Sequence, residues 1–264
     1  NPKKVVVIGG GVAGLCAAFI AKEKGHEVTL YEAGDVLGGN MRLAAYPPGK
    51  GDITNMIRSY IHRCQKDGVK IVMNCEVTPE LIKEEKPDSV IIATGSKTLI
   101  LPIEGIDNPA IIHGSDLLDG KRPAGKKVLV VGGGMVGCET AAFLGEQEHD
   151  VTVIEFRDTV GADVIHEHRV YLMKDFEDYG IKEITGAKVC KFYEDGVEYE
   201  TADGVRHETR GYDSVILSMG FRNYNPLEEK IKDLVPETHV IGDAIRARRA
   251  LDATKEAYEV ASRL

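Results

Sequence analysis

The same glycine-rich turn occurs twice in this sequence, and each copy joins an apolar run to an alanine-containing stretch. The first copy, GGGVAG, occupies residues 9–14 after the apolar residues 5–8, and the second, GGGMVG, occupies residues 132–137 after residues 128–131. The glycines of a G-x-G-x-x-G turn allow a tight bend, close approach of the backbone to a pyrophosphate and close packing of the next helix, whose N-terminus attracts the anion. One copy would be a weak indication. Two copies predict two bound dinucleotides, and therefore electron transfer between them.

An acidic residue follows each glycine turn, at the end of the next predicted strand. Glu32 follows the apolar residues 28–31, and Glu155 follows residues 151–154 at the same distance beyond its own turn. A carboxylate about 20 residues after the turn accepts the hydroxyl groups of an adenosine ribose. Glu155 would also repel the 2′-phosphate of NADP, and Arg157 offsets that repulsion only in part. We therefore expect NAD rather than NADP.

Length and charge narrow the class of protein. At 264 residues the chain has room for two domains, each with its own core. With 42 acidic against 33 basic side chains and a net charge of −9, it offers no electrostatic footprint for nucleic acid or an anionic membrane. No apolar stretch reaches the roughly 20 residues that span a bilayer. We expect a cytoplasmic protein with no nucleic-acid or membrane partner, and the sequence leaves a homo-oligomer open.

The cysteine and histidine spacings match neither a redox pair nor a metal site. The five cysteines form no C-x-x-C pair: they are Cys16, Cys64, Cys75, Cys138 and Cys190. Cys16 and Cys138 come just after the glycine turns, where we expect small core residues, so a dithiol relay is not expected. His166 and His168 flank Glu167, whereas paired ligands on a helix use i, i+4 spacing. We predict a solvated helix face there and no metal ligand.

Strand and helix patterns alternate along the chain in the order of an α/β protein. The first unit has predicted strands at residues 5–8, 28–31, 69–73 and 89–93, and predicted helices at 13–24, 52–66 and 80–85. After a connector at 96–126, the second unit has a β-α-β segment at 127–155, a helix at 163–179, and strands at 181–192, 196–200 and 215–219. The last strand, 240–243, and the helix 250–263 fit the first unit better. We therefore predict that the second domain is inserted into the first.

This layout resembles the two-dinucleotide-fold flavoproteins related to glutathione reductase and thioredoxin reductase. Among them, the chain is most similar to the C-terminal half of the multidomain NADH:flavin oxidoreductases, which include 2,4-dienoyl-CoA reductase, 2-enoate reductase and trimethylamine dehydrogenase. The likeness covers essentially all 264 residues. Its more particular motifs are Asn1-Pro2-Lys3-Lys4, Pro48-Gly49-Lys50 after Gly38-Gly39, and Val240-Ile241-Gly242-Asp243 followed by an arginine-rich turn and Leu251-Asp252-Ala253.

The resemblance implies an α/β fold of two Rossmann-like domains: an FAD domain at residues 1–104 and 221–264, and an inserted NAD(H) domain at 105–220. Asp243 would bind a ribityl hydroxyl, or serve only as a turn or helix cap. Val77 would meet the adenine edge through its backbone, or be plain core. The amides that open the last helix would face the flavin N1–C2=O edge. The residues expected to bind FAD are Gly9, Gly11, Val12, Ala13, Gly14, Glu32, Gly38, Gly39, Asn40, Val77, Ala93, Thr94, Gly95, Gly242, Asp243, Leu251, Asp252 and Ala253.

The second domain would bind the nicotinamide dinucleotide. The residues expected there are Gly132, Gly134, Gly137, Glu139, Glu155 and Gly220. For Glu139, contact with the cofactor and exposure to solvent are equally open. Because hydride transfer between two aligned rings needs no nucleophile, we nominate no catalytic acid–base residue. The arginines Arg246, Arg248 and Arg249 would grip a phosphate or dock a partner domain, or form a plain surface loop.

In the related proteins this half follows a TIM barrel with FMN and a four-cysteine iron–sulfur motif, and neither is present here. Because the chain opens on its first strand without an initiator Met, we expect a C-terminal part that oxidises NADH. It would pass electrons through the iron–sulfur cluster and FMN of that absent N-terminal half to an activated C=C bond. Two alternatives stay open. One is a structural domain that holds ADP in place of FAD, as in trimethylamine dehydrogenase. The other is a free-standing NADH-dependent ferredoxin or rubredoxin reductase, which the net charge of −9 disfavours.

Overall fold

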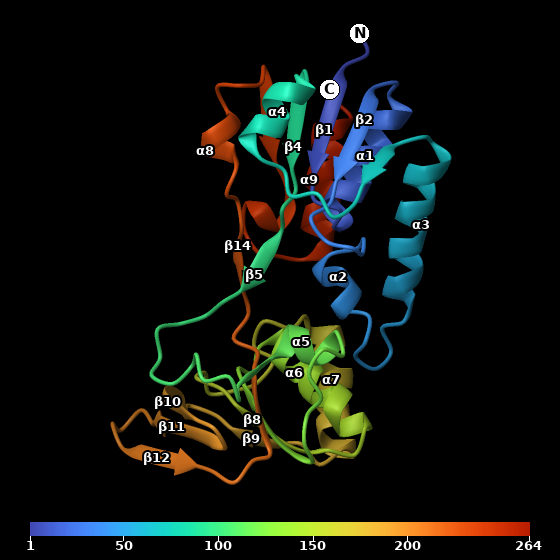
Figure 1. The fold of residues 1–264 in the computed structure, drawn as a ribbon. Helices are drawn as coiled ribbons and strands as arrows, with labels where there is room; N and C mark the ends of the chain where they lie inside the picture. Colours follow the sequence, from blue (N-terminus) through green and yellow to red (C-terminus); the bar gives the residue numbers. More distant parts are fainter. The chain divides into compact units, whose positions relative to one another are not determined.

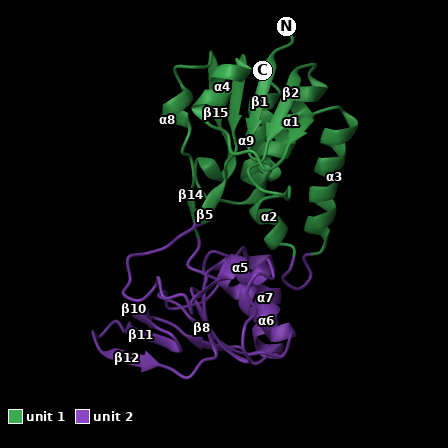
Figure 2. Cartoon of the chain, viewed as in Figure 1, with its two compact units in different colours: residues 1–45, 51–97, 221–264 green, residues 46–50, 98–220 purple.

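The computed structural model describes residues 1–264, and the chain forms two compact units (Figure 2). The first comprises Asn1–Ala45, Gly51–Lys97 and Phe221–Leu264, and the second comprises Tyr46–Lys50 and Thr98–Gly220. The second unit is therefore inserted into the first. The first crossing lies at Lys97 rather than at residue 104, because Leu99 N already donates to Gly220 O (2.9 Å). The short loop before Gly51 also belongs to the second unit.

A five-stranded parallel sheet forms the centre of the first unit (Figure 1). Across the sheet the strands are β15 (Glu237–Val240), β4 (Ser89–Ile92), β1 (Lys4–Ile8), β2 (Glu27–Tyr31) and β3 (Lys70–Val72). The final strand, β15, pairs with β4, as the sequence predicted for the returning segment. The apolar runs of β1 and β4 are continuous because both faces of a parallel sheet are covered.

Helices cover both faces of this sheet. The helices are α1 (Val12–Glu23), α2 (Asn40–Leu43), α3 (Asp52–Lys66), α4 (Pro79–Glu85), α8 (Glu228–Ile231) and α9 (Ala250–Ala261). Alternate residues of β1 point to opposite sides: Val5 and Val7 pack with α1, α3 and α9, whereas Val6 and Ile8 pack with α4 and α8. The helix α4 begins where Thr78 Oγ1 accepts a bond from Leu81 N (3.3 Å).

The second unit repeats the parallel sheet but covers one of its faces differently. Its parallel strands, in order across the sheet, are β6 (Ile112–His113), β13 (Ser214–Leu217), β7 (Lys127–Val131), β8 (Asp150–Ile154) and β9 (Lys182–Ile184). One face packs against α5 (Gly114–Leu118), α6 (Met135–Glu146) and α7 (His166–Asp178). An antiparallel sheet of β10 (Lys188–Tyr193), β11 (Gly196–Glu200) and β12 (Arg206–Thr209) covers the other.

Several predicted boundaries were wrong. The connector at 96–126 contains β5 (Ser96–Thr98), which pairs with β14 (Phe221–Asn223), and also contains β6 and α5. The segment 181–192 is two strands in two different sheets, separated at Gly186, whose φ is +63°. The helix expected from 163 starts at His166. The last strand ends at Val240, and Gly242–Ala244 form a short 3-10 turn, η1. No helix combines the length and apolar character needed to cross a membrane.

Candidate functional site

The first glycine turn lies at the carboxyl end of β1, and two of its glycines are required by packing. Gly9 has a φ of +106°, and a Cβ there would lie 2.3 Å from the carbonyl oxygen of Ala93. A Cβ at Gly14 would lie 1.9 Å from the carbonyl oxygen of Gly9. Both distances are far inside van der Waals contact. These two glycines therefore hold α1 tightly against the ends of β1 and β4, and they are needed by the fold itself.

Gly11 differs from both, because nothing in the fold requires it. Its φ of −73° and ψ of −178° are open to any residue, and a Cβ there would have no atom within 4 Å. It caps the N-terminus of α1 with no side-chain hydrogen bond, beside the Gly11–Gly38 bridge. Unpaired amides and the helix dipole attract an anion. An open space over such amides, kept free by a glycine, fits the pyrophosphate of a dinucleotide.

Glu32 links this turn to the end of β2. Its Oε2 accepts a bond from Gly10 N (2.6 Å), and its Oε1 accepts one from Gly34 N (2.7 Å). A carboxylate offers about four acceptor positions, so two remain for other donors. The side chain is half-buried and fixed at both oxygens. It is thus held ready to accept the two hydroxyl groups of a ribose.

The later predicted residues converge on the same end of the sheet. Gly38 N donates to Gly10 O (2.8 Å), which ties this segment to the glycine turn. Asn40 Nδ2 donates to Ser96 O and Oγ (3.2 Å each), and Ser96 Oγ donates to Asp243 Oδ2 (3.0 Å). Ser96, which was not among the predicted residues, therefore connects them. It follows Ala93-Thr94-Gly95 directly, and that position was the only sequence signal for it.

Gly242 brings β15 and α9 close to α1. A Cβ at Gly242 would lie 3.0 Å from Ala13 Cβ and 3.4 Å from Ala253 Cβ, and its φ is +63°. Gly242 N donates to Glu256 Oε2 (2.7 Å), and the other oxygen of Glu256 pairs with Arg248. The sequence prediction missed Glu256. Arg248 N also donates to Asp243 (3.0 Å), which ties the arginine turn to this end of the sheet, while Arg246, Arg248 and Arg249 are all exposed.

Three other predicted residues lie in three different environments. The Val77 side chain is buried in the core between β4 and α4. The Leu251 side chain is 75% exposed. Asp252 accepts a bond from Arg249 N (3.2 Å) and so caps α9 with its carboxylate. For Val77, any contact with a cofactor therefore falls to the backbone rather than to the side chain.

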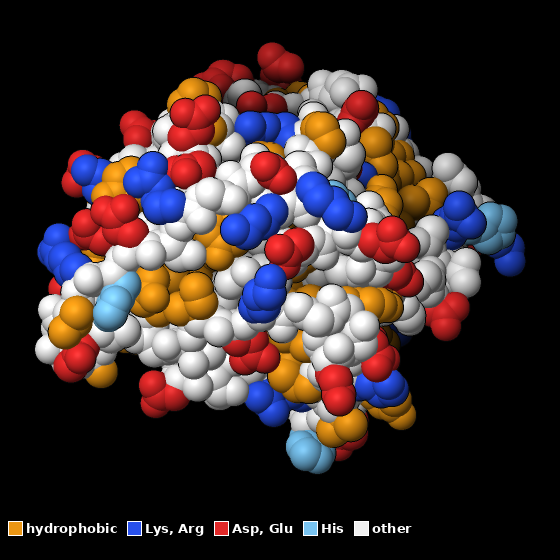
Figure 3. Space-filling model, turned by 90° about the horizontal axis from the view of Figure 1, so that it is seen from below, with side chains coloured by type: hydrophobic (Ala, Val, Ile, Leu, Met, Phe, Trp, Pro, Cys, Tyr) orange, Lys and Arg blue, Asp and Glu red, His pale blue; other side chains and the backbone are white.

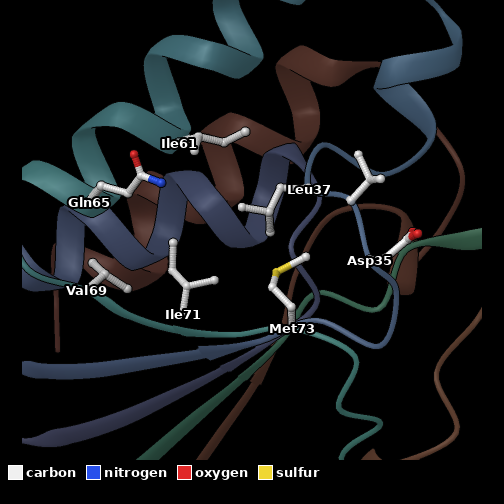
Figure 4. A pocket seen from close by; sticks show the side chains of 8 residues that line it. Asp35, Leu37, Ile61, Gln65, Val69, Ile71 and Met73 are labelled. Carbon is white, nitrogen blue, oxygen red and sulfur yellow. The ribbon is translucent and has the colours of Figure 1, made fainter.

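A groove of about 590 Å³ opens beside this end of the sheet (Figure 4). Its lining is Asp35, Val36, Leu37, Ile61, Gln65, Val69, Ile71 and Met73, contributed by the loop after β2, by α3 and by the β3 segment. None of the predicted FAD-binding residues lines it. The groove is mostly apolar, and Asp35 is its only ionisable group, so it offers space but little chemistry.

The second unit repeats the geometry of the first turn. A Cβ at Gly132 would lie 2.4 Å from Ser218 O, and one at Gly137 would lie 1.8 Å from Gly132 O. Glu155 accepts bonds from Gly133 N (2.6 Å) and Arg157 N (3.0 Å), as Glu32 does from its own turn. Gly220 has a φ of +97° and open space where a Cβ would be. The same cradle is therefore built twice from the same local sequence.

Glu139 does not face solvent, which removes one of its two predicted environments. It is 5% exposed and lies on α6, where it pairs with Lys50 and with His168 Nε2 (3.1 Å). Lys50 ends the Pro-Gly-Lys loop, which was noted in the sequence without a role. His168 is half-buried on α7, whereas His166 and Glu167 are exposed. Only part of the H-E-H segment is the predicted solvated face.

Two cysteines lie in the core, as the sequence predicted: Cys16 and Cys138. Cys16, Cys64 and Cys138 are buried, and all five cysteines are free. Burial raises the pKa of Cys16 to about 11 and the pKa values of Cys64 and Cys138 to about 12. These thiols stay protonated at neutral pH and are poor nucleophiles. They serve as small core residues.

Two parallel-sheet units, each with a glycine turn at a helix N-terminus and a carboxylate held by backbone amides, define a two-dinucleotide oxidoreductase. Residues 3–242 match the pyridine nucleotide-disulphide oxidoreductase family, and the chain belongs to that family. Members of that family use FAD and NAD(P)H, and the chain is an FAD-dependent NAD(P)H oxidoreductase unit. All five of its cysteines are free, and three of them are buried.

Its relatives are longer reductases. The chain is 35% identical to bilirubin reductase of Mediterraneibacter gnavus, over 98% of this chain and 40% of the relative, and 33% identical to cinnamate reductase of Clostridium sporogenes, over 99% and 39%. The structure of a 2-naphthoyl-CoA reductase complex matches with a TM-score of 0.94 and 32% identity, over 100% of this chain and 40% of that one. The chain thus spans about two fifths of the relatives that it matches.

Proposed function

We propose that the first unit binds FAD, that the second binds NADH, and that the chain is the electron-input part of a reductase. Bound together, the two cofactors supply hydride transfer between their rings. The observation that carries the proposal is the pair of matching cradles, each with a glycine turn and a carboxylate held by two backbone amides. A protein that holds two such cradles is suited to an exchange between two dinucleotides.

In the first unit, the protein's part is to bind and orient FAD. The Val12 amide and the space over Gly11 would receive the pyrophosphate. Glu32 would accept the ribose hydroxyls, and Asp243, already held by Ser96 and Arg248, would accept a ribityl hydroxyl. The N-terminus of α9 would lie toward the part of the flavin that gains negative charge on reduction. The other residues that the sequence predicts for this unit would contact the same FAD.

In the second unit, Glu155 favours NADH over NADPH. Its carboxylate is fixed by Gly133 N and Arg157 N, so it cannot turn away from a 2′-phosphate without losing both bonds. Gly132, Gly134 and Gly137 would form the rest of the cradle, with Gly220 leaving space near the nicotinamide. Glu139 would act by fixing α6 to Lys50 and His168, beneath the bound dinucleotide.

The proposal extends to a partner that the chain does not contain. The relatives have a further part beyond the region matched here, and they reduce bilirubin, cinnamate and 2-naphthoyl-CoA by name. We propose that the chain delivers electrons to an N-terminal TIM-barrel half with an iron–sulfur cluster and FMN, which reduces an activated C=C bond in the cytoplasm. Acidic and basic side chains are interspersed on the face shown in Figure 3, so neither sign dominates there. Homo-oligomerisation is left to measurement.

Matched substitutions of the two carboxylates test the assignment. Glu32→Ala should lower FAD content while ADP-ribose still binds, and Glu155→Ala should retain FAD but bind NADH about 10- to 100-fold more weakly, since each loses hydrogen bonds to a charged group. FAD content, NADH affinity and thermal unfolding would be measured on both variants. If Glu32→Ala keeps its flavin and loses NADH, the two sites are assigned the wrong way round. If both variants behave like the wild type, neither cradle binds a dinucleotide.

A further inference from the structure

The N-terminus of α6 already carries an anion from the chain itself. Asp163 Oδ1 accepts a hydrogen bond from Met135 N, the first residue of the helix, at 2.9 Å. The two carboxylate oxygens lie 3.3 and 3.5 Å from the point where a Cβ of Gly134 would be. The Met135 amide is the donor that a pyrophosphate would use in this cradle. Asp163 therefore occupies the space and the hydrogen bond that the NADH pyrophosphate needs.

The segment after β8 holds Asp163 in this position. Gly161 N donates to Gly133 O (2.7 Å), so the segment is bonded directly to the glycine turn. Val160 and Val164 are buried in the core under α6, which fixes the backbone on both sides of Asp163. Asp163 itself is exposed. Its carboxylate can therefore rotate into solvent while the backbone that carries it stays in place.

The first unit shows that the fold of the turn does not require such a carboxylate. Gly11 and Gly134 have nearly the same conformation, with φ of −73° and −72° and ψ of −178° and −176°. Both cap the helix that follows. No atom lies within 4 Å of a Cβ built at Gly11, whereas the Asp163 carboxylate lies over Gly134. Two cradles of the same shape thus differ in what approaches the helix N-terminus, which is the Gly38 backbone in the first and the Asp163 carboxylate in the second.

We propose that Asp163 is an internal competitor of the NADH pyrophosphate and sets the affinity of the second unit for its dinucleotide. The inference rests on the proposed binding of NADH there. Two anions cannot share one amide at a helix N-terminus, because like charges at this distance repel. NADH binding then requires the Asp163 side chain to leave Met135 N, and release of NAD⁺ is assisted by its return.

Asp163→Asn tests the proposal, because asparagine keeps an oxygen for the Met135 amide and removes the charge. Asp158→Asn is the matched control: it removes the same charge from the same segment, but its carboxylate faces Gly186 and not α6. The FAD-loaded chain and both variants would be titrated with NADH, with ADP-ribose and with adenosine, which carries no phosphate. FAD content and thermal unfolding would show that the variants are folded.

If Asp163 competes with the pyrophosphate, Asp163→Asn lowers the Kd for NADH and for ADP-ribose about two- to thirtyfold, which is the effect of one charge at a helix N-terminus. Adenosine affinity should stay within error, and Asp158→Asn should match the wild type. If the wild type binds NADH and Asp163→Asn binds it equally or more weakly, the inference is wrong while the proposed function stands. If neither protein binds NADH although FAD is bound, the NADH site of the proposed function is wrong, and this inference fails with it.

Discussion

Adding one methyl group at Gly11 should weaken flavin binding without unfolding the protein. The position is open to any residue, with φ near −73° and no atom within 4 Å of a Cβ. In the cofactor-free chain, alanine removes freedom from the unfolded state, which stabilises by about 0.4–1 kcal/mol, but it is a poorer helix cap than glycine by a similar amount. The free energy of unfolding should therefore change by less than about 1 kcal/mol.

The effect on FAD should be much larger. The new methyl fills the space that the pyrophosphate would occupy, and overpacking of a well-fitted site costs about 1–3 kcal/mol. That energy corresponds to about 5- to 150-fold weaker binding. The assay is FAD affinity by fluorescence titration, together with urea unfolding of the cofactor-free chain, so that ligand binding does not add to the measured stability.

Gly14→Ala is the contrasting variant. Its Cβ would lie 1.9 Å from the Gly9 carbonyl oxygen, so the backbone must shift and the unfolding free energy should fall by about 3 kcal/mol or more. Gly11→Ala should leave NADH or ADP-ribose affinity unchanged, because it lies in the other unit. The reasoning is refuted if Gly11→Ala binds FAD like the wild type, or if it loses FAD only because it is as unstable as Gly14→Ala.

Three further expectations concern stability and reactivity. Burial and the nearby Lys3 lower the pKa of His26 below 6.5, and His26 Nδ1 accepts a hydrogen bond from Lys3 N (3.0 Å). As the pH falls, the unfolded chain therefore takes up a proton at this histidine before the folded chain does. The contribution of His26 to the free energy of unfolding should be fully present above pH 6.5 and be lost as the pH falls through the lower pKa of the folded state. His26→Gln should flatten this decline, as measured by urea unfolding at several pH values. Thr78→Ala removes the cap on Leu81 N and should cost about 0.5–1 kcal/mol, whereas an unchanged unfolding midpoint would contradict the cap. A thiol reagent should modify Cys75 and Cys190 quickly in the native protein. It should modify the three buried cysteines, Cys16, Cys64 and Cys138, only when the protein unfolds. Rapid reaction of a third cysteine would contradict their burial.

The repeated cradle was predictable because its determinants are local. The glycine turns, the apolar strands before them and the acids after them lie within one β-α-β segment, and each half reproduces the same bonds to Glu32 and Glu155. The insertion of the second unit was also predictable, since residues 240–243 are too few to found a domain. In both cases the local sequence pattern and the lengths of the segments predicted the arrangement that the structure has.

The contacts between distant parts of the sequence were not predictable in the same way. Asp163 reaches Met135, Ser96 reaches Asp243, and Glu139 pairs with Lys50 across long stretches of sequence. No local motif encodes such pairs. The short strand β5 has no apolar alternation, and it exists because β14 pairs with it. The boundary at Lys97 was missed for the same reason.

The most direct test of the central claim is anaerobic titration of the FAD-loaded chain with NADH, followed by visible absorbance. The account predicts a yellow protein whose flavin absorbance is lost with NADH in a one-to-one ratio, while NADPH at the same concentration reacts much more slowly. A colourless chain that takes up no FAD but binds ADP would contradict the account and leave a nucleotide-binding structural domain. A yellow chain that neither nicotinamide dinucleotide can reduce would contradict the assignment of the second unit.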